Sequence, residues 1–406
     1  MKWLKFAAQN ALRNRRRSLV TVIIAGVATA SVLVGGGFAL FTYEGLKEVA
    51  ARDSGHIIVA HKDYFDKEED TPLQFGLSNP QALRRQMEQN PSVRIALPRL
   101  RFTGLISNGD KSTIYVGMGV DPSGEFIARG PFLSVTRGNT LSTRPKADDL
   151  PEVMLGTELA RLLKADVGSV LTVLGTTTEG SLNALDVRVQ GLYSVGVPDL
   201  DRRSLIVSLP TAQSLLRSDR VSELSLYLKR TDDTPTVLVE LQPLIQGFAV
   251  RTWRDQAFFY EAVRQLYNRI FGMLGVVIAL LVFFAVSNTV SLSVVERTRE
   301  IGTLRAMGTL PREIVRNFLL EAGVLGASGI VVGMLLATGI SVLLMVLDVQ
   351  MPPPPGRSTT YPLRIEFSWL LYGITAASML FVSIASAWVS CRDAARTSIV
   401  KALTHV

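Results

Sequence analysis

Charge is missing from four long stretches of this 406-residue chain. No Asp, Glu, Lys or Arg occurs in Ser18–Tyr43, Ile270–Val295, Ala322–Leu347 or Phe367–Cys391. A bilayer hydrocarbon core about 30 Å thick is crossed by roughly 20 apolar residues at about 1.5 Å each, so every stretch is long enough to span it. This absence excludes an ordinary soluble protein and predicts four membrane-spanning helices.

The chain is also poor in residues that form disulfides or bind metals. It has one cysteine, Cys391, and three histidines, so no internal disulfide is expected. His56 and His61 lie five positions apart at the end of a predicted strand, a spacing that puts them on opposite faces and argues against a metal site.

Motifs for nucleotide binding and catalysis are lacking as well. The dipeptide Gly-Lys never occurs, so the chain has no Gly-x-x-x-x-Gly-Lys-Ser/Thr loop for a nucleotide. No Gly-x-Ser-x-Gly turn is present either. We therefore expect a non-catalytic protein that binds no cofactor of its own.

Positive charge is concentrated in short segments beside the apolar stretches. Residues 1–17 hold six basic groups and no acid, and residues 296–317 hold five basic groups against three acids. Residues 44–269 hold 27 basic and 28 acidic groups and are nearly neutral. By the positive-inside rule, both termini and the 296–317 loop face the cytoplasm, whereas 44–269 faces outside. The net charge of +8 therefore indicates membrane topology and no nucleic-acid partner.

The predicted fold class is a polytopic α-helical membrane protein with four transmembrane helices. A large α+β extracytoplasmic domain lies between the first and second helices. The first apolar run is too long for the apolar region of a cleaved signal peptide, so we expect it to remain as a span. In chain order the predicted segments are an N-terminal cytoplasmic segment (1–17), span one (18–43), the external domain (44–269), span two (270–295), a cytoplasmic loop (296–321), span three (322–347), a short external loop (348–366), span four (367–391) and a cytoplasmic tail (392–406).

Alternating and β-branched runs dominate the external domain. Turn residues bound these runs, and helical periodicity separates them. The segment 134–150 is rich in Thr, Arg, Pro and Asp and is interpreted as a surface loop or as the boundary between two subdomains. The predicted strands are 56–60, 99–107, 112–120, 170–174, 186–195, 204–209 and 222–229, and the predicted helices are 80–89, 157–163, 211–217 and 236–244.

Apolar residues at helical spacing follow the first span and precede the second. This pattern favours two helices that leave the membrane as a stalk, although both could also be helices at the edge of the domain. The residues concerned are Leu46, Val49 and Ala50 after the first span, and Phe259, Val263, Leu266 and Ile270 before the second.

Glycines cluster in the same two spans. Gly35, Gly36 and Gly37 lie in the first, and Gly272 and Gly275 lie in the second. Small residues let helix backbones approach closely, so we predict that these glycines pack in a dimer. Flexibility or simple packing against lipid is the alternative interpretation.

The segment Glu296–Gly308 reads as a short amphipathic cytoplasmic helix. Gly308 can end it in a left-handed cap, and a second helix begins near Thr309 with Pro311 in its first turn. Such a helix suits a groove on a soluble partner, or it rests on lipid headgroups. Ile301, Leu304 and Met307 form its apolar edge, Arg297, Arg299 and Arg305 its basic edge, and Glu296, Glu300, Gly302 and Gly308 complete the candidate contact set.

This segment resembles the FtsX-like permease signature. The family contains the transmembrane subunits of MacB- and LolC/LolE-type ABC transporters. The resemblance extends to Phe318–Ala322 with Gly326, Gly329 and Gly333, and it also covers 8–17, 153–163, 167–173 and 189–201. Residues 393–403 are similar to the family's closing motif, with Ser398 where a proline usually stands.

The resemblance implies a coupling helix that docks on a cytoplasmic ABC ATPase dimer. Because this chain lacks the phosphate loop, ATP and Mg²⁺ are expected on that partner chain. It also implies an amphipathic helix at 1–17, an external domain with an inserted part near 100–220, and a location in the inner membrane. Two permease copies, identical or different, would work together among membrane lipids and move when the ATPase hydrolyses ATP.

The resemblance leaves the substrate and the external partner open. A lipoprotein, lipid, drug or peptide fits a transporter of this kind, which can work with a periplasmic adaptor or a lipoprotein chaperone. The alternative function is an FtsX-like regulator that activates a periplasmic cell-wall hydrolase. A sensor without an ATPase is disfavoured, because the cytoplasmic parts are only loops.

Overall fold

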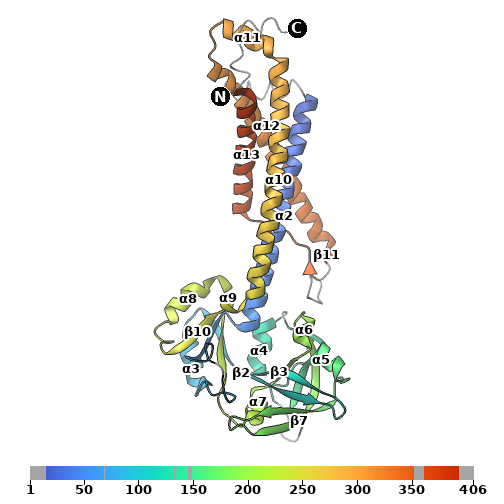
Figure 1. Ribbon diagram of the computed structural model, residues 1–406, viewed down its shortest axis with the longest axis vertical. Coiled ribbons are helices and arrows are strands. Elements are labelled where there is room, and N and C mark those ends of the chain that lie inside the picture. The colour runs from blue at the N-terminus through green and yellow to red at the C-terminus, as the bar shows by residue number, and fades with distance from the viewer. Residues whose placement is uncertain (1–14, 68, 131–132, 145–148, 352–360, 393–406) are drawn as a thin grey trace. The chain divides into compact units, whose positions relative to one another are not determined.

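The computed structural model describes residues 15–392, apart from 68, 131–132, 145–148 and 352–360 (Figure 1). The chain divides into two compact units. The helical unit comprises Met1–Glu44, Ala262–Met351 and Pro362–Val406, and the external unit comprises Gly45–Glu261 with Pro352–Tyr361. The predicted N-terminal helix at 1–14, the tail beyond Arg392 and the proline-rich 352–360 segment lie outside the described residues.

Four long helices form the helical unit: α2 (Arg15–Ser54), α10 (Phe258–Glu296), α12 (Pro311–Leu347) and α13 (Trp369–Arg392). Each is long and apolar enough to cross a membrane. A short helix, α11 (Thr298–Ala306), connects α10 with α12. The structure therefore confirms the four predicted spans and the large α+β domain between the first and the second.

Helices α2 and α12 cross closely at small residues. A Cβ atom added to Gly329 would lie 2.6 Å from the Cβ of Ala25, and one added to Gly333 would lie 2.5 Å from the Cβ of Thr29. Such contacts let dispersion forces act between the two backbones, where the hydrophobic effect does not drive association. The glycines therefore fix where α12 can pack on α2.

Helices α2 and α10 run without a break beyond their apolar stretches. The first continues to Ser54 and the second begins at Phe258, so both extend into the external unit as single elements. Within the helical unit they are joined near this end, because the Tyr43 hydroxyl donates a hydrogen bond to Asn268 Oδ1 at 2.8 Å. Each long helix is therefore a continuous connection between the two units.

The external unit is built on a sheet whose strand order is β10-β1-β9-β2-β3-β8-β5-β7-β4, with β6 paired to β2 and β7. Strand β2 (Val93–Ser107) is 15 residues long and pairs with β9 in its first half and with β3 and β6 in its second. The remaining strands are β1 (Ile57–His61), β3 (Ser112–Val120), β4 (Ser134–Gly138), β5 (Glu152–Gly156), β6 (Val170–Thr176), β7 (Leu182–Ser194), β8 (Ser204–Ser208), β9 (Glu223–Leu228) and β10 (Phe248–Thr252), with a separate pair β11 (Gln350–Met351) and β12 (Tyr361–Pro362).

Short helices connect these strands. The first, α3 (Pro80–Met87), begins at the predicted residue: Asn79 caps it by accepting a hydrogen bond from the Ala82 amide, and Pro80 occupies the first turn. The others are α4 (Pro122–Arg129), α5 (Thr157–Leu162), α6 (Pro198–Asp201), α7 (Leu209–Leu216), α8 (Thr234–Leu241), α9 (Trp253–Gln256) and the 3₁₀ turn Thr231–Asp233.

All seven predicted strands are present, but three further strands of the large sheet, β4, β5 and β10, were missed, as was the separate β11–β12 pair. The loop prediction for 134–150 is wrong at Ser134–Gly138, which forms β4 and pairs with β7. The five residues of β4 are mostly exposed and carry little hydrophobic pattern, so pairing with a neighbour decides their conformation. Strands β5 and β10 and helix α4 were likewise not predicted.

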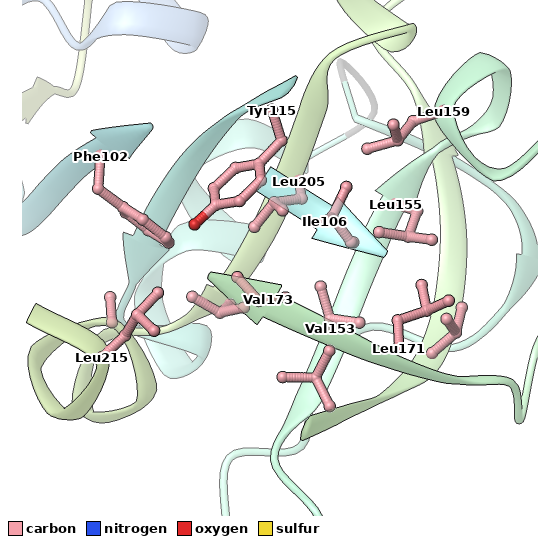
Figure 2. Close-up of a cluster of buried hydrophobic side chains, with 14 of the residues drawn as sticks. Phe102, Ile106, Tyr115, Val153, Leu155, Leu159, Leu171, Val173, Leu205 and Leu215 are labelled. Carbon is pink, nitrogen blue, oxygen red and sulfur yellow. The ribbon is translucent and has the colours of Figure 1, made fainter. Parts of the chain in front are cut away.

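The external unit contains two main hydrophobic cores. Figure 2 shows the larger one, in which Phe102, Tyr115 and Leu205 point toward one another from different strands. Apart from Leu73, its buried members lie between Leu100 and Leu216. The buried members of the second core come from Ile57–Ala96 and Val221–Ile245. Strand β2 contributes to both cores and so joins them.

Candidate functional site

The candidate contact helix is α11, and its ends are defined by backbone geometry. Gly308, two residues past its end, has a φ of +96°, a conformation that side chains disfavour. Pro311 then opens α12, and Glu313 accepts a hydrogen bond from the Leu310 amide at 3.4 Å. The turn between the two helices is thus set locally by a glycine and a proline, as the sequence indicated.

The apolar edge of α11 divides into a buried part and an exposed part. Ile301 is 8% exposed and belongs to a hydrophobic cluster with Ile314 and Phe318 of α12. Leu304 is 42% exposed and Met307 is 71% exposed. Ile301 therefore anchors the helix within the chain, whereas Leu304 and Met307 are available to a partner. Leu310, which was not among the predicted contact residues, is 62% exposed beside them.

Two ion pairs fix the segment just before α11 to the long helices. Arg17 of α2 makes two hydrogen bonds to the Glu296 carboxylate, at 3.0 and 2.6 Å. Arg297 lies 3.3 Å from Glu321 of α12, and both side chains are largely buried. These two members of the predicted contact set thus hold the chain together. Their partners Arg17 and Glu321 were not predicted.

The remaining predicted members of the contact set have varied environments. Gly302 is buried, Arg305 is partly buried, and Glu300 and Gly308 are exposed. Arg299 is exposed and makes no ion pair with another residue that the structure describes. Arg299 is therefore the charge on this helix that a partner can meet without displacing a bond within the chain.

The predicted packing glycines fall into two groups. A Cβ added to Gly35 would lie 3.2 Å from Phe271, one at Gly36 would lie 3.0 Å from Leu371, and one at Gly37 would lie 2.5 Å from Ile365. These three glycines therefore pack within the chain. At Gly272 and Gly275 an added Cβ would meet nothing within 4 Å, so these two positions are open.

The predicted stalk residues lie on two helices, with Leu46, Val49 and Ala50 on α2 and the other four on α10. Val263 is partly buried and Leu266 is 54% exposed. The side chain of Phe259 lies outside the described residues. The dimer-packing role of these positions stays a prediction.

A buried polar network surrounds the end of α2 in the external unit. The guanidinium of Arg99 pairs with the Glu125 carboxylate, and both side chains are fully buried. Arg99 Nη1 also donates to the Asp53 carbonyl at 2.7 Å, and Tyr227 Oη donates to the Arg52 carbonyl at 3.0 Å. The last carbonyls of a helix lack partners within it, and here side chains of β2 and β9 supply them.

Sequence reasoning did not identify this network. Arg99 and Arg101 alternate along β2 and so lie on one face of the strand, but nothing in that pattern shows that Arg99 is buried. Burial lowers the pKa of Arg99, but the charge of Glu125 and its hydrogen bond outweigh this and raise it. Arg99 is therefore charged, and its contact with Glu125 compensates for the hydration that it loses on burial.

His56 and His61 both pack against neighbouring side chains of the external unit. His56 is 3% exposed, and its Nε2 lies 2.9 Å from Thr231 Oγ1. His61 stacks on Phe75 with the ring centres 5.6 Å apart. Among the described residues, no group of three or more His, Cys, Asp or Glu side chains could hold a metal ion.

Two family models match this chain. The FtsX-like permease C-terminal model matches residues 272–399, and the MacB-like periplasmic core domain model matches residues 18–244, which is more than half of the chain. Together they cover most of the helical unit and most of the external unit.

Curated relatives support the same assignment. The chain is 28% identical to the lipoprotein-releasing system transmembrane protein LolC of Xylella fastidiosa over 75% of this chain and 76% of that protein. It is 26% identical to the macrolide export ATP-binding/permease protein MacB of Sodalis glossinidius, over 98% of this chain but only 59% of that protein. Among solved structures, the periplasmic region of MacB from Actinobacillus actinomycetemcomitans aligns with 52% of this chain and 95% of that one, with 14% identity and a TM-score of 0.36.

Proposed function

The chain is an ABC transporter permease of the FtsX-like family with a MacB-like periplasmic core domain, and from this premise we propose that a separate cytoplasmic ATPase dimer drives it through α11. The ATPase binds ATP and Mg²⁺, and this chain contributes no cofactor site. Two permease copies face the ATPase dimer, so each ATPase subunit meets one α11.

One observation carries the proposal: α11 is anchored on one side and exposed on the other. We call Arg299, Leu304, Met307 and Leu310 the docking surface. Its three apolar side chains are between 42% and 71% exposed, next to the buried anchor Ile301. A partner groove that covers such a face gains the hydrophobic contribution and finds one basic group for an acidic contact.

The attachments of α11 give displacement a route through the chain. Arg17–Glu296 connects the segment before α11 with α2, and Arg297–Glu321 connects it with α12. Helices α2 and α10 then continue unbroken into the external unit. In the proposed mechanism these helices transmit a push on the docking surface to the external unit, and the nucleotide is bound by the partner ATPase.

The relatives suggest the class of substrate. One is named for lipoprotein release and the other for macrolide export. Both names describe hydrophobic molecules handled at a membrane. We propose a lipoprotein, lipid, drug or peptide as the substrate, taken up at the outer face of the inner membrane. A periplasmic adaptor or lipoprotein chaperone would then receive it.

The docking surface is tested by Leu304→Asp in the full chain, reconstituted with its ATPase in lipid nanodiscs. Loss of one buried leucine contact costs about 1.5 to 3 kcal/mol, so we expect the affinity for the ATPase to fall by roughly 10- to 100-fold. Leu244→Asp is a matched control, because Leu244 is 43% exposed in the external unit. The measurement is co-purification of the ATPase together with its stimulated ATP hydrolysis.

A charge reversal gives an independent check. Arg299→Glu should weaken the same binding, whereas Arg364→Glu, an equal change in the short loop before α13, should leave it intact. Undiminished ATPase binding and coupling in both Leu304→Asp and Arg299→Glu would overturn the docking assignment.

A further inference from the structure

A cavity of about 520 Å³ opens in the external unit between the end of α2, strands β3 and β8, and the segment that carries α6. Its size falls in the range of small-molecule sites. All of its lining residues belong to the external unit. Neither the docking surface nor the membrane spans contribute to it.

Much of the cavity wall is apolar. Residues alternate between the two faces of a strand, so Tyr115 of β3 and Leu205 of β8 point into the core of Figure 2. Val116, the neighbour of Tyr115, lines the cavity and is 49% exposed. Met118 and Leu200 extend this wall, and Leu200 is 59% exposed. The cavity therefore presents to water apolar side chains that the described residues of the external unit leave exposed.

Four arginines line the same cavity, against two aspartates. Arg129 pairs with Asp53, and Arg101 pairs with Glu223 at 3.0 Å. Glu223 is itself buried behind Arg101, where its side chain is 1% exposed. These two arginines are thus largely neutralised by partners within the domain.

The other two arginines carry the excess positive charge. Arg202 lies 4.0 Å from Asp199, and both side chains are more than half exposed, so this pair is weak. Arg203 is exposed and makes no ion pair with another described residue. Two exposed guanidinium groups therefore stand beside the apolar wall.

We propose that this cavity binds an anionic amphiphile. Its carboxylate or phosphate pairs with Arg203 and Arg202, and its acyl or similar apolar chain lies on Val116, Met118 and Leu200. Charged hydrogen bonds to guanidinium groups are the strong ones, and the chain removes apolar wall from water. A neutral hydrocarbon would provide no anion for the two arginines. An inorganic anion would leave the apolar side chains of the cavity exposed to water. One molecule with both parts satisfies the site.

Because the chain has a single native cysteine, one substitution removes every native thiol. In the full chain with Cys391→Ser, Val116→Cys places one thiol on the cavity wall, and its alkylation by a membrane-impermeant maleimide is timed in nanodiscs of zwitterionic lipid. The probes are decyl phosphate, decanoate, decanol and inorganic phosphate. Leu182→Cys is the control thiol, because Leu182 is 72% exposed and does not line the cavity.

At ten times its Kd, decyl phosphate or decanoate leaves only about one site in ten empty. We therefore expect it to slow the alkylation of Val116→Cys by about tenfold. The control thiol should react at its original rate. Arg203→Glu or the milder Arg203→Gln, added to Val116→Cys, should abolish this protection. Arg161→Glu, which reverses an exposed arginine that does not line the cavity, should preserve it.

Several results would overturn the proposal. Equal protection by decanol would show that the cavity does not recognise the charge of the ligand. Equal protection by inorganic phosphate would show that the cavity does not recognise its alkyl chain. Absence of protection by every probe, or protection that survives Arg203→Glu, contradicts it directly. The experiment needs neither ATPase nor nucleotide, so its outcome is independent of the proposed docking of α11.

Discussion

Individual buried polar residues hold the end of α2 in the external unit. Arg99 and Tyr227 bind its last carbonyl groups, and Ser225 Oγ donates to the Ser54 carbonyl at 3.0 Å. Since α2 also forms the first span, these hydrogen bonds attach the end of a membrane-spanning helix to the external unit. A buried charge pair of this kind tolerates the loss of one partner poorly.

Glu125→Gln should therefore destabilise the external unit by about 3 kcal/mol, because it leaves Arg99 buried without its counter-charge. The measurement is the denaturant midpoint of the purified full chain. Arg161→Gln is the control, since its exposed pair with Glu158 contributes at most about 1 kcal/mol. Equal midpoints for the two variants would show that the Arg99–Glu125 pair contributes no special stability.

His56 makes the stability of the external unit depend on pH. Burial lowers its pKa to about 4, while the charges of Glu48 and Arg52 act in opposite directions. The unfolded chain, with a pKa near 6.5, binds the proton more readily, so this contribution is complete above pH 6.5 and is lost as the pH falls toward 4. Between pH 7.5 and 5 we expect a loss of about 2 kcal/mol.

This loss should appear as a fall in the denaturant midpoint over that range. In His56→Gln the part of the slope due to His56 should be gone. An unchanged pH dependence in the variant would contradict the assignment.

At the scale of elements, close helix crossings and capped turns decide the arrangement of the helical unit. Gly333 faces Thr29 and the Gly26 carbonyl, so α12 cannot carry a larger residue there without moving from α2. Gly339, six residues later on the same helix, has no atom within 4 Å of an added Cβ. Two glycines of one helix thus have different roles, and only their surroundings reveal it.

Gly333→Val should destabilise the helical unit by about 1 to 3 kcal/mol, as overpacking does elsewhere. Gly339→Val should be close to neutral and serves as the matched control. Thermal unfolding of both variants in the same detergent measures the difference. A similar effect of the two substitutions would argue against the α2–α12 crossing.

For the whole molecule, the proposed function requires α11 and the external unit to face opposite sides of the membrane. Positive charge beside the spans predicts that α11 is cytoplasmic. Helices α2 and α10 are continuous from the spans into the external unit. A cysteine-labelling experiment on whole cells tests which side of the membrane each end faces.

In the Cys391→Ser background, Leu182→Cys should react with a membrane-impermeant maleimide in cells whose outer membrane has been permeabilised. Thr303→Cys, on the exposed face of α11, should react only after the membrane is opened. The reverse pattern would invert the orientation and exclude a cytoplasmic ATPase at α11.

The amino-acid sequence by itself determined the four spans, the cytoplasmic position expected for α11, and the start of helices such as α3. These features depend on local composition, and local composition is visible in one sequence. Strands β4, β5 and β10 were missed because their few residues are fixed by pairing with distant strands.

Only the tertiary structure decided which residues of a pattern are buried and which are available. It separated Ile301 from Leu304 on one helix, buried Arg99 with Glu125, and brought Asp53, Val116 and Arg203 to one cavity. Contacts between residues far apart in the chain leave no periodic trace in it. The chain's place in its family was thus readable from local motifs, whereas the docking surface and the cavity depended on packing.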